Sequence, residues 1–345
     1  MKAVVYHGPG KKSWEQVPDP TIEQETDVIV RVTTTTICGS DLHILKGDVP
    51  DTPEGTILGH EAVGVIEEVG PGVRNFRKGD RVLIPAITAC GQCDACRQGM
   101  YSHCVRGGWI LGHTINGVQA QYARIPFADT SLHKVPEELK DEDVLFLTDI
   151  LPTAYECGVL SGQIQPGDTV AVVGVGPVGL AAVMLSRLYS PSVIVAIDLD
   201  PRRLERARRL GADVTVQAGQ EDPVEVVHKL TGGRGVDVAI EAVGIPATFE
   251  LCTDLVAPGG RIANVGVHGK PVTLRLEKLW ARNIRITTRL VDTITVDRLL
   301  KLIAAGKIDP APLASHTFKM DDFMQAYEVF SQAAAHDAVK VVVKQ

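Results

Sequence analysis

The stretch Thr169-Val-Ala-Val-Val-Gly-Val-Gly-Pro-Val-Gly-Leu180 decides the fold. Thr169–Val173 is apolar enough for a buried parallel strand, and the residues after Gly179 have the composition of a helix. Gly174, Gly176 and Gly179 between them spell G-x-G-x-x-G. The first glycine permits a tight turn, the second lets a pyrophosphate approach the backbone, and the third lets helix and strand pack closely. This stretch predicts a dinucleotide site.

The residues around this motif strengthen the prediction. Pro177 and Val178 open the helix, where free N–H groups and the helix dipole favour an anion. A second apolar run, 193–197, ends in Asp198, 19 positions after Gly179. A carboxylate about 20 residues beyond the glycines is expected to bind the adenosine ribose. An acid there disfavours a 2′-phosphate, so we expect NAD rather than NADP, although Arg202 and Arg203 argue the other way.

Length and composition indicate a globular protein of two domains. The chain has 345 residues, 45% of them hydrophobic and 22% charged. The net charge of −7 gives no support to nucleic-acid binding. The N-terminus lacks the apolar core of a signal peptide, and the apolar run 170–185 is short for a membrane span. We therefore expect a cytoplasmic protein that binds neither membrane nor nucleic acid.

The character of the chain changes near residue 150. Before it, short β-type runs alternate with Gly- and Pro-rich turns, at 28–32, 62–66, 81–84 and 119–125. This pattern predicts a barrel-like β domain. After residue 153, strands alternate with helices, which predicts a doubly wound parallel sheet. Beyond residue 290 we expect two helices, 296–305 and 321–333, and a last strand, 339–344, that returns to the first domain.

Four of the seven cysteines fall within one short segment: Cys90, Cys93, Cys96 and Cys104. In a chain with no secretion signal, such crowding favours a metal over disulfides. Four thiolates can close a tetrahedral shell around zinc, which leaves no position for a substrate. An iron–sulfur cluster is the main chemical rival. The interpretation favours structural zinc.

A resemblance extends over nearly the whole chain. The segments Cys38-Gly-Ser-Asp-Leu-His43 and Gly59-His-Glu-Ala-Val-Gly64, the cysteine loop and the glycine motif follow one another in order. In this order and spacing they resemble the zinc-dependent medium-chain alcohol dehydrogenases, in the branch that acts on secondary alcohols. The resemblance implies an α/β fold: a GroES-like β-barrel catalytic domain, 1–152 with 291–345 returning to it, and a Rossmann NAD-binding domain, 153–290.

The resemblance also implies a catalytic zinc, and so two zinc ions per subunit. Its ligands would be Cys38, His60 and Asp149, where many members carry a third cysteine in place of the aspartate. Carboxylate is a legitimate zinc ligand, although Asp149 could instead cap a helix before Pro152. Glu61 is an occasional ligand in relatives, and we favour a supporting carboxylate near the metal.

The resemblance implies further roles for single residues. Ser40 and His43 match a hydroxyl and a histidine that pass the alcohol proton to solvent, although Ser40 could cap a turn and His43 could simply be exposed. Trp109 matches an aromatic of the substrate pocket, where Ser40 also lies. The cofactor contacts implied by the resemblance are Thr153 at the nicotinamide, Arg203 at the adenosine ribose and Lys340 at the phosphates or ribose.

The resemblance implies hydride transfer between NAD and a secondary or primary alcohol, with a ketone or aldehyde as the other reactant. Dehydrogenation of polyols, amino-alcohols or small aldehydes is the alternative within the family. A structural, crystallin-like protein is the non-enzyme alternative. Loss of the metal ligands would mark such a protein, and here all three are present. The resemblance favours a homotetramer, with a dimer as the alternative. The sequence assigns no role to Cys157 or Cys252, and names neither the natural substrate nor the stereospecificity.

Overall fold

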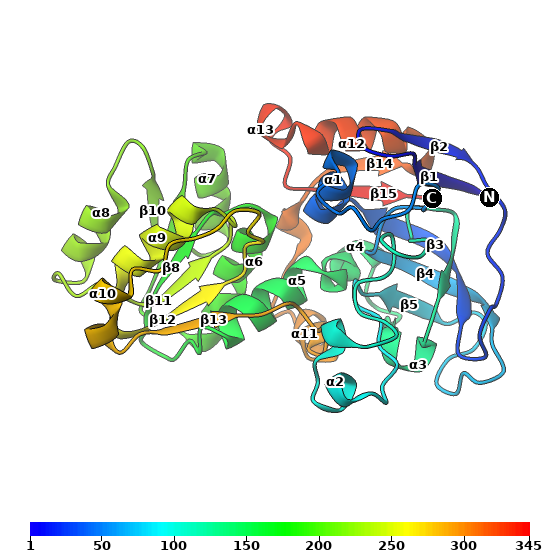
Figure 1. Cartoon of the computed structure of the whole chain (residues 1–345), viewed down its shortest axis with the longest axis horizontal. Coiled ribbons are helices and arrows are strands. Elements are labelled where there is room, and N and C mark those ends of the chain that lie inside the picture. Colours follow the sequence, from blue (N-terminus) through cyan, green and yellow to red (C-terminus); the bar gives the residue numbers. More distant parts are fainter. The chain divides into compact units, whose positions relative to one another are not determined.

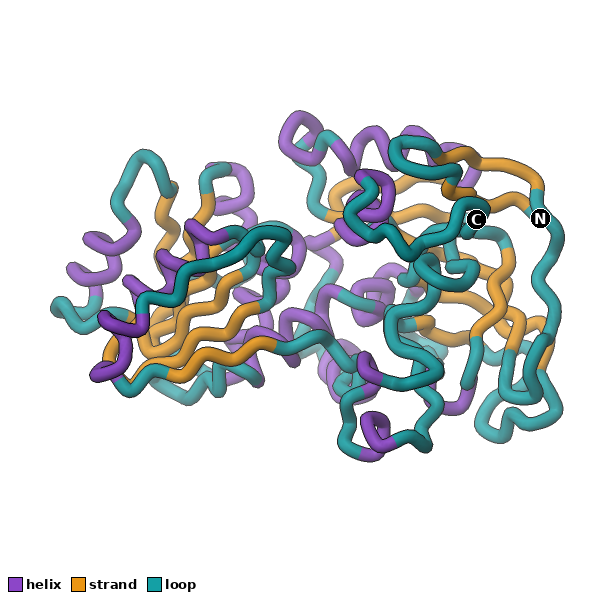
Figure 2. The backbone as a smooth tube through the Cα atoms, viewed as in Figure 1, coloured by secondary structure: helices purple, strands orange, loops and turns teal.

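The computed structural model describes every residue from Met1 to Gln345. Two compact units divide the chain: Met1–Asp149 together with Asp292–Gln345, and Ile150–Val291. Both combine strands, helices and connecting loops (Figure 2). None of the helices has the length and apolar character that crossing a bilayer requires. The domain limits predicted at 152/153 and 290/291 stay a prediction.

The unit Ile150–Val291 is built on a parallel sheet with the strand order β10-β9-β8-β11-β12-β13 (Figure 1). Every neighbouring pair in it is parallel. The central strands are apolar along their length because both faces of the sheet are covered. The strands are β8 (Thr169–Val173), β9 (Val193–Asp198), β10 (Val214–Gln217), β11 (Val236–Glu241), β12 (Val256–Asn264) and β13 (Arg285–Thr288).

The strand order divides the connecting helices between the two faces. From β8 the chain moves outward through β9 to β10, whereas from β11 it moves the opposite way to β12. Crossovers between parallel strands are right-handed, so α6 (Pro177–Ser186) and α7 (Pro201–Arg209) cover one face. The other face is covered by α8 (Pro223–Leu230) and α9 (Pro246–Leu255). The order reverses between β8 and β11, which is where a doubly wound sheet binds its ligand. Shorter segments complete the unit: α5 (Ile150–Thr153), η3 (Ala154–Leu160), η4 (Arg187–Tyr189), α10 (Leu276–Leu279) and η5 (Trp280–Arg282).

The other unit contains a sheet of order β14-β15-β3-β4-β5-β7, with β6 paired to β3, and a separate hairpin β1-β2. Apart from β14 with β15, its strand pairs are antiparallel. The strands are β1 (Lys2–Tyr6), β2 (Lys12–Gln16), β3 (Val28–Thr36), β4 (Ala62–Val69), β5 (Arg81–Ile84), β6 (Tyr122–Ile125), β7 (His133–Lys134), β14 (Ala314–Lys319) and β15 (Lys340–Lys344). The C-terminal strand β15 thus lies beside β3, far from it in sequence.

Short helices connect these strands. They are α1 (Gly39–Lys46), α2 (Asp94–Arg97), η1 (Tyr101–His103), α3 (Ala128–Ser131), α4 (Asp141–Val144), η2 (Leu145–Thr148), α11 (Val296–Ala304), η6 (Ala311–Leu313), η7 (Met320–Asp322), α12 (Phe323–Ser331) and α13 (Ala333–His336). Helix α12 packs on β15 and turns Phe323, Tyr327 and Phe330 into the core of the unit.

Strand registers bring distant residues to one end of this sheet. Thr35 of β3 pairs with Ala62 of β4, and the two strands are antiparallel. The residues just after β3 therefore lie beside those just before β4. Val342 of β15 pairs with Thr36 in the same antiparallel sense, so the start of β15 reaches the same end. Cys38, His60 and Lys340 converge for this reason.

The structure differs from the sequence prediction in the limits of one strand and one helix. The strand predicted over 119–125 covers only β6, because Gln119 and Gln121 hydrogen-bond outside a regular ladder. The helix predicted over 321–333 begins instead with the single turn η7 and ends at Ser331. The predicted α/β fold class is confirmed: one unit is a doubly wound parallel sheet, and the other is built mainly of antiparallel strands.

Candidate functional site

The first candidate metal centre gathers at the end of the sheet where β3 stops and β4 starts. Cys38 lies between β3 and α1, His60 and Glu61 immediately precede β4, and Asp149 follows η2. One possible ligand atom of each of these four residues lies within 4.8 Å of the others. Cys38 Sγ is 3.4 Å from Asp149 Oδ2, and His60 Nε2 is 3.7 Å from the same oxygen. Thiol, imidazole and carboxylate are the donors that zinc accepts, so these residues fit the ion.

Burial and charge perturb these groups strongly. Burial works against a charged His60, but hydrogen bonds with Asp149 and Cys38 outweigh it and raise the pKa of His60 well above its ordinary value. Burial, and then the charge of Asp149, raises the pKa of the Cys38 thiol. A zinc ion requires a thiolate and a neutral imidazole, so its binding would displace these protons.

Both carboxylate oxygens of Glu61 accept hydrogen bonds from neighbouring side chains. Its Oε1 accepts a hydrogen bond of 2.7 Å from Lys340 Nζ, and its Oε2 accepts one of 3.2 Å from Thr148 Oγ1. Lys340 is 1% exposed and also donates to the carbonyl oxygen of Ile37 at 3.1 Å. The ion pair thus lies against the metal centre. The predicted contact of Lys340 with the cofactor stays a prediction.

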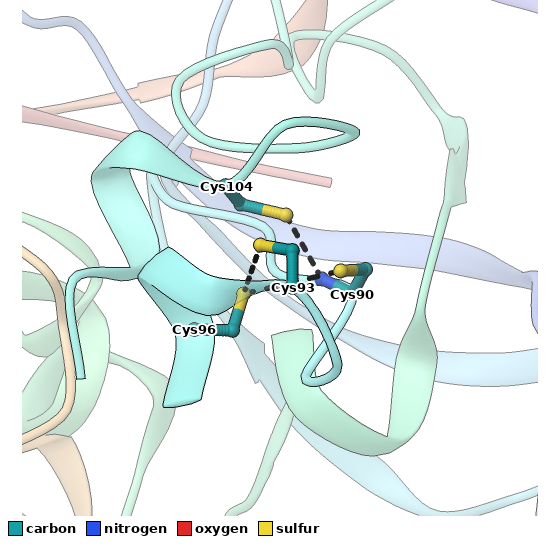
Figure 3. Close-up of side chains that lie close together, drawn as sticks. All are labelled: Cys90, Cys93, Cys96 and Cys104. Carbon is teal, nitrogen blue, oxygen red and sulfur yellow. Dashed lines mark hydrogen bonds between the residues drawn. The ribbon is translucent and has the colours of Figure 1, made fainter. Parts of the chain in front are cut away.

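The second candidate metal centre consists of the four predicted cysteines. Figure 3 shows the side chains of Cys90, Cys93, Cys96 and Cys104 pointing toward one another. Cys93 Sγ and Cys96 Sγ are 3.5 Å apart, and Cys90 Sγ and Cys96 Sγ are 4.0 Å apart. The four sulfurs lie within 4.8 Å of one another. With four thiol donors and no other group among them, they fit a closed tetrahedral zinc site.

Backbone N–H groups in this loop stabilise a negative charge on Cys90. Burial disfavours a Cys90 thiolate, but N–H groups of Gln92 and Cys93 outweigh it and lower the pKa of Cys90 to about 6. Burial and the neighbouring Cys93 raise the pKa of Cys96 to about 12. Thiols so close cannot all ionise without a cation to balance them.

The residues expected to pass a proton occupy one helix. Ser40 and His43 are three apart in α1, a spacing that places them on the same side of a helix. Ser40 Oγ is 3.4 Å from Cys38 Sγ, whereas His43 is exposed and its Nδ1 lies 2.8 Å from Asp48 Oδ2. The serine therefore lies at the metal centre and the histidine lies at the surface.

Trp109 lies against the metal centre. Its ring meets His60 edge-on, with centroids 5.9 Å apart, and stacks on His113 at 4.5 Å. The first contact places the indole ring beside a proposed ligand, and the second stacks it on a residue outside the ligand set. Its predicted role in a substrate pocket stays a prediction.

The glycine motif lies between β8 and α6, beside the reversal of strand order. A Cβ on Gly179 would lie 1.9 Å from the carbonyl oxygen of Gly174, so strand and helix approach too closely for any side chain. Gly174 has φ +87°, as the tight turn requires. A Cβ on Gly176 would meet nothing within 4 Å. Open space over a glycine at the N-terminus of α6 fits a pyrophosphate. Pro177 and Val178 form the first turn of that helix.

Asp198 ends β9 beside this loop. Its Oδ2 accepts a hydrogen bond of 2.8 Å from the backbone N–H of Val175, and its Oδ1 accepts one of 2.9 Å from the backbone N–H of Asp200. Arg203 Nη1 lies 4.0 Å from Asp198 Oδ2. Thr153 ends α5 in the same unit as the glycine motif.

Comparisons with known proteins agree with these sites. The family model described as "Alcohol dehydrogenase GroES-like domain" matches residues 24–137, and the model described as "Zinc-binding dehydrogenase" matches residues 177–305. An alcohol dehydrogenase of Cupriavidus necator is 39% identical, with coverage of 100% of this chain and 98% of that protein. The chain belongs to the zinc-dependent medium-chain alcohol dehydrogenase family.

Solved structures of other zinc-dependent dehydrogenases have the same fold. Zinc-dependent alcohol dehydrogenase 2 of Streptococcus pneumoniae, in its apo form, is 51% identical with a TM-score of 0.95, and coverage is 100% of this chain and 98% of that one. A zinc-binding dehydrogenase of Sinorhizobium meliloti bound to NADP is 30% identical with a TM-score of 0.90, and coverage is 100% and 99%. Membership in the alcohol dehydrogenase family makes this protein an oxidoreductase, and a non-catalytic, crystallin-like role is not favoured.

Sequence reasoning missed one residue of this alcohol dehydrogenase site. Asp41 is fully buried in α1, and its Oδ1 lies 3.8 Å from His60 Nδ1. Neither of these two atoms has a hydrogen-bond partner. Its Oδ2 accepts from the N–H of Cys38 at 2.9 Å. A metal-bound histidine usually donates its other N–H to a carboxylate, so Asp41 fits that role toward His60. Its place three residues after Cys38, where an acid caps a helix, was the available signal.

Proposed function

We propose that this protein is an NAD-dependent alcohol dehydrogenase with a catalytic zinc held by Cys38, His60 and Asp149. The observation that carries the proposal is the asymmetry of this set. His60 is buried, whereas Cys38 and Asp149 are partly exposed. With Glu61 held by Lys340 and Thr148, the first set would supply three protein donors and leave one position of a catalytic zinc for an alcohol, whereas the four cysteines would fill all four positions. We propose a structural zinc for the four cysteines, and so two zinc ions per subunit.

We propose a secondary alcohol as the preferred substrate, with primary alcohols also accepted. Zinc at this centre would lower the pKa of an alcohol hydroxyl, and NAD would accept the hydride. Ser40 Oγ, beside Cys38, would receive the alcohol proton, and exposed His43 would pass it to solvent. Trp109 would shape the pocket with an apolar face. Glu61 would stay with Lys340 rather than bind the metal.

The preference for NAD is part of the proposal. Asp198 would accept hydrogen bonds from the adenosine ribose, and its charge would repel a 2′-phosphate. Arg203 lies near the Asp198 carboxylate, and Arg202 Nη2 is 2.7 Å from Asp200 Oδ2, so acids already face both cations. The pyrophosphate would bind at Gly176, Pro177 and Val178. Thr153 and Lys340 stay as candidate cofactor contacts.

We also propose a homotetramer that works in the cytoplasm. All seven cysteines are free thiols. Free thiols suit a reducing compartment, and five of the seven belong to the two candidate metal centres.

A steady-state panel tests the proposed reaction. The purified protein with zinc is assayed with primary alcohols, secondary alcohols, diols and small aldehydes, each with NAD and with NADP. We expect the highest kcat/KM for a secondary alcohol with NAD. A higher kcat/KM for an aldehyde or a polyol would assign the protein to another activity of the family. Lack of turnover with every substrate would contradict the proposal.

A further inference from the structure

A buried hydrogen-bond chain connects the C-terminal helix α12 to the candidate catalytic metal centre. Tyr327 Oη donates to Gln119 Oε1 at 2.6 Å, and Gln119 Nε2 donates to Asp41 Oδ2 at 2.9 Å. All three side chains are at most 1% exposed. Gln119 Nε2 also donates to the carbonyl oxygen of Thr36 at 3.2 Å. Both protons of the amide and its oxygen are therefore engaged.

The chemistry of the partners sets the direction of this chain. An ionised carboxylate only accepts hydrogen bonds, so the amide nitrogen of Gln119 must face Asp41. The amide oxygen must then face Tyr327, whose hydroxyl is left to donate. A flipped amide would place its oxygen against the Asp41 carboxylate. Tyr327 thus selects the amide orientation that Asp41 needs.

Gln119 also packs against the backbone next to His60. Gly59, the residue before His60, has φ +92°, and a Cβ built there would lie 2.4 Å from Gln119 Cγ. The side chain of Gln119 therefore contacts the segment that carries one metal ligand. Gln119 also donates a hydrogen bond to the Asp41 carboxylate, which accepts the backbone N–H of Cys38, a second metal ligand.

The far oxygen of the same carboxylate completes the connection. Asp41 Oδ1 and His60 Nδ1 face each other at 3.8 Å, and both are buried without a hydrogen-bond partner. A metal on His60 Nε2 places the ring proton on Nδ1, where Asp41 Oδ1 can accept it. The position of Oδ1 depends on how the other oxygen is held.

We propose that Gln119 and Tyr327 are positioning residues for the catalytic metal, acting on His60 through Asp41. Tyr327 orients the Gln119 amide, Gln119 fixes the Asp41 carboxylate, and Asp41 holds the imidazole with Nε2 toward the metal. This inference rests on the proposed zinc site at Cys38, His60 and Asp149. It predicts that α12, remote in sequence from every ligand, controls how tightly that zinc is held.

The test measures zinc affinity rather than turnover. Zinc per subunit is followed during equilibration with increasing chelator in wild type, Gln119→Met, Tyr327→Phe and the double variant. The Cys38→Ser variant identifies the zinc that remains at the four cysteines. The control is Tyr155→Phe, which removes another buried phenol hydroxyl, 2.9 Å from Tyr189 Oη, in the unit Ile150–Val291 rather than in the unit that carries the proposed ligands. Visible spectra of the cobalt-substituted proteins report the ligand geometry.

We expect Gln119→Met to weaken binding of the catalytic zinc by about 10–100-fold, as for partners of metal ligands generally. Tyr327→Phe should weaken it less and shift the cobalt spectrum in the same direction. Because Tyr327 acts through Gln119, the double variant should match Gln119→Met. Tyr155→Phe should leave zinc affinity and spectrum unchanged.

Two results would overturn the inference: wild-type zinc affinity in Tyr327→Phe, or independent, additive losses in the double variant. If Gln119→Met does not fold, Tyr327→Phe alone decides. Failure of the proposed zinc site itself would look different, because wild type and Cys38→Ser would then hold the same amount of zinc.

Discussion

Single residues carry the proposed preference for NAD and the proposed proton path. Asp198 holds the N–H of Val175 in the glycine loop and faces Arg203, so it links the loop to the end of β9. His43 is exposed and paired with Asp48, whereas Ser40 lies beside a proposed metal ligand. A change at His43 alters an exposed side chain, whereas a change at Asp198 also removes the acceptor of two backbone N–H groups.

Asp198→Gly should weaken NAD and admit NADP. The substitution removes the proposed ribose acceptor and the charge that repels a 2′-phosphate, and it frees Arg203 for that phosphate. We expect the ratio of kcat/KM for NAD to that for NADP to fall by at least tenfold, about 1.4 kcal/mol. Arg203→Ala in the same background should reverse the gain with NADP. A wild-type protein that prefers NADP would refute the assignment of Asp198.

His43→Gln should slow alcohol oxidation most at low pH, and added buffer base should restore part of the rate. A general base typically contributes about 10²-fold or more, so a relay open to solvent should lose less than that. The measurement is kcat against pH with and without a small amine buffer. An unchanged profile would make His43 a bystander.

Because of Tyr327, the free energy of unfolding should fall as the pH rises above about 10. Burial, and then the charge of Asp41, raises the pKa of Tyr327 well above its ordinary value. The unfolded chain releases this proton near pH 10, so above that pH the folded state binds more protons and stability falls as pH rises. The free energy of unfolding of wild type minus that of Tyr327→Phe should be largest below pH 10 and shrink above it. A difference that grows with pH would contradict this account.

At the scale of elements, two glycines at the β8–α6 junction have different roles: Gly179 permits close packing, and Gly176 leaves space for the proposed pyrophosphate. Gly179→Ala would press a Cβ onto the Gly174 carbonyl oxygen, whereas Gly176→Ala would meet open space at an ordinary φ of −68°. Gly179→Ala should lower the free energy of unfolding by about 1–3 kcal/mol, the usual range for overpacking. Gly176→Ala should keep wild-type stability but bind NAD about tenfold more weakly, by titration. Equal stability of both variants would refute the packing argument.

The elements that the sequence predicted are those whose signals are close together in the chain. The strand at 169–173 and the glycine loop were predictable because their signals are local: an apolar run, three glycines and an acid. The cysteine loop was predictable because its ligands are close in sequence. Gln119 and Tyr327 were not, because neither belongs to a local motif, and the only local signal for Asp41 was its helix-capping position three residues after Cys38. They meet only after β1 to β4 and α12 pack, as hydrogen bonds spanning 78 and 208 residues.

At the scale of the whole molecule, the proposed catalytic-zinc ligands and the proposed NAD-binding loop belong to different units. The proposed metal ligands and the chain from Tyr327 belong to the unit Met1–Asp149 with Asp292–Gln345. The glycine loop and Asp198 belong to the unit Ile150–Val291. The C-terminal segment belongs to the unit with the proposed catalytic zinc and supplies both Lys340 and Tyr327 to it.

The central claim is that the protein holds two metal ions with separable roles, at the two clusters of donors. Zinc per subunit and alcohol oxidation with NAD, measured together on wild type, Cys38→Ser and Cys96→Ser, test it most directly. We expect two zinc ions in wild type. Cys38→Ser should lose one zinc and almost all activity while remaining folded. Cys96→Ser should mainly lose stability, because a closed site contributes folding free energy. One zinc in wild type, iron with sulfide at the cysteines, or full activity in Cys38→Ser would contradict the account.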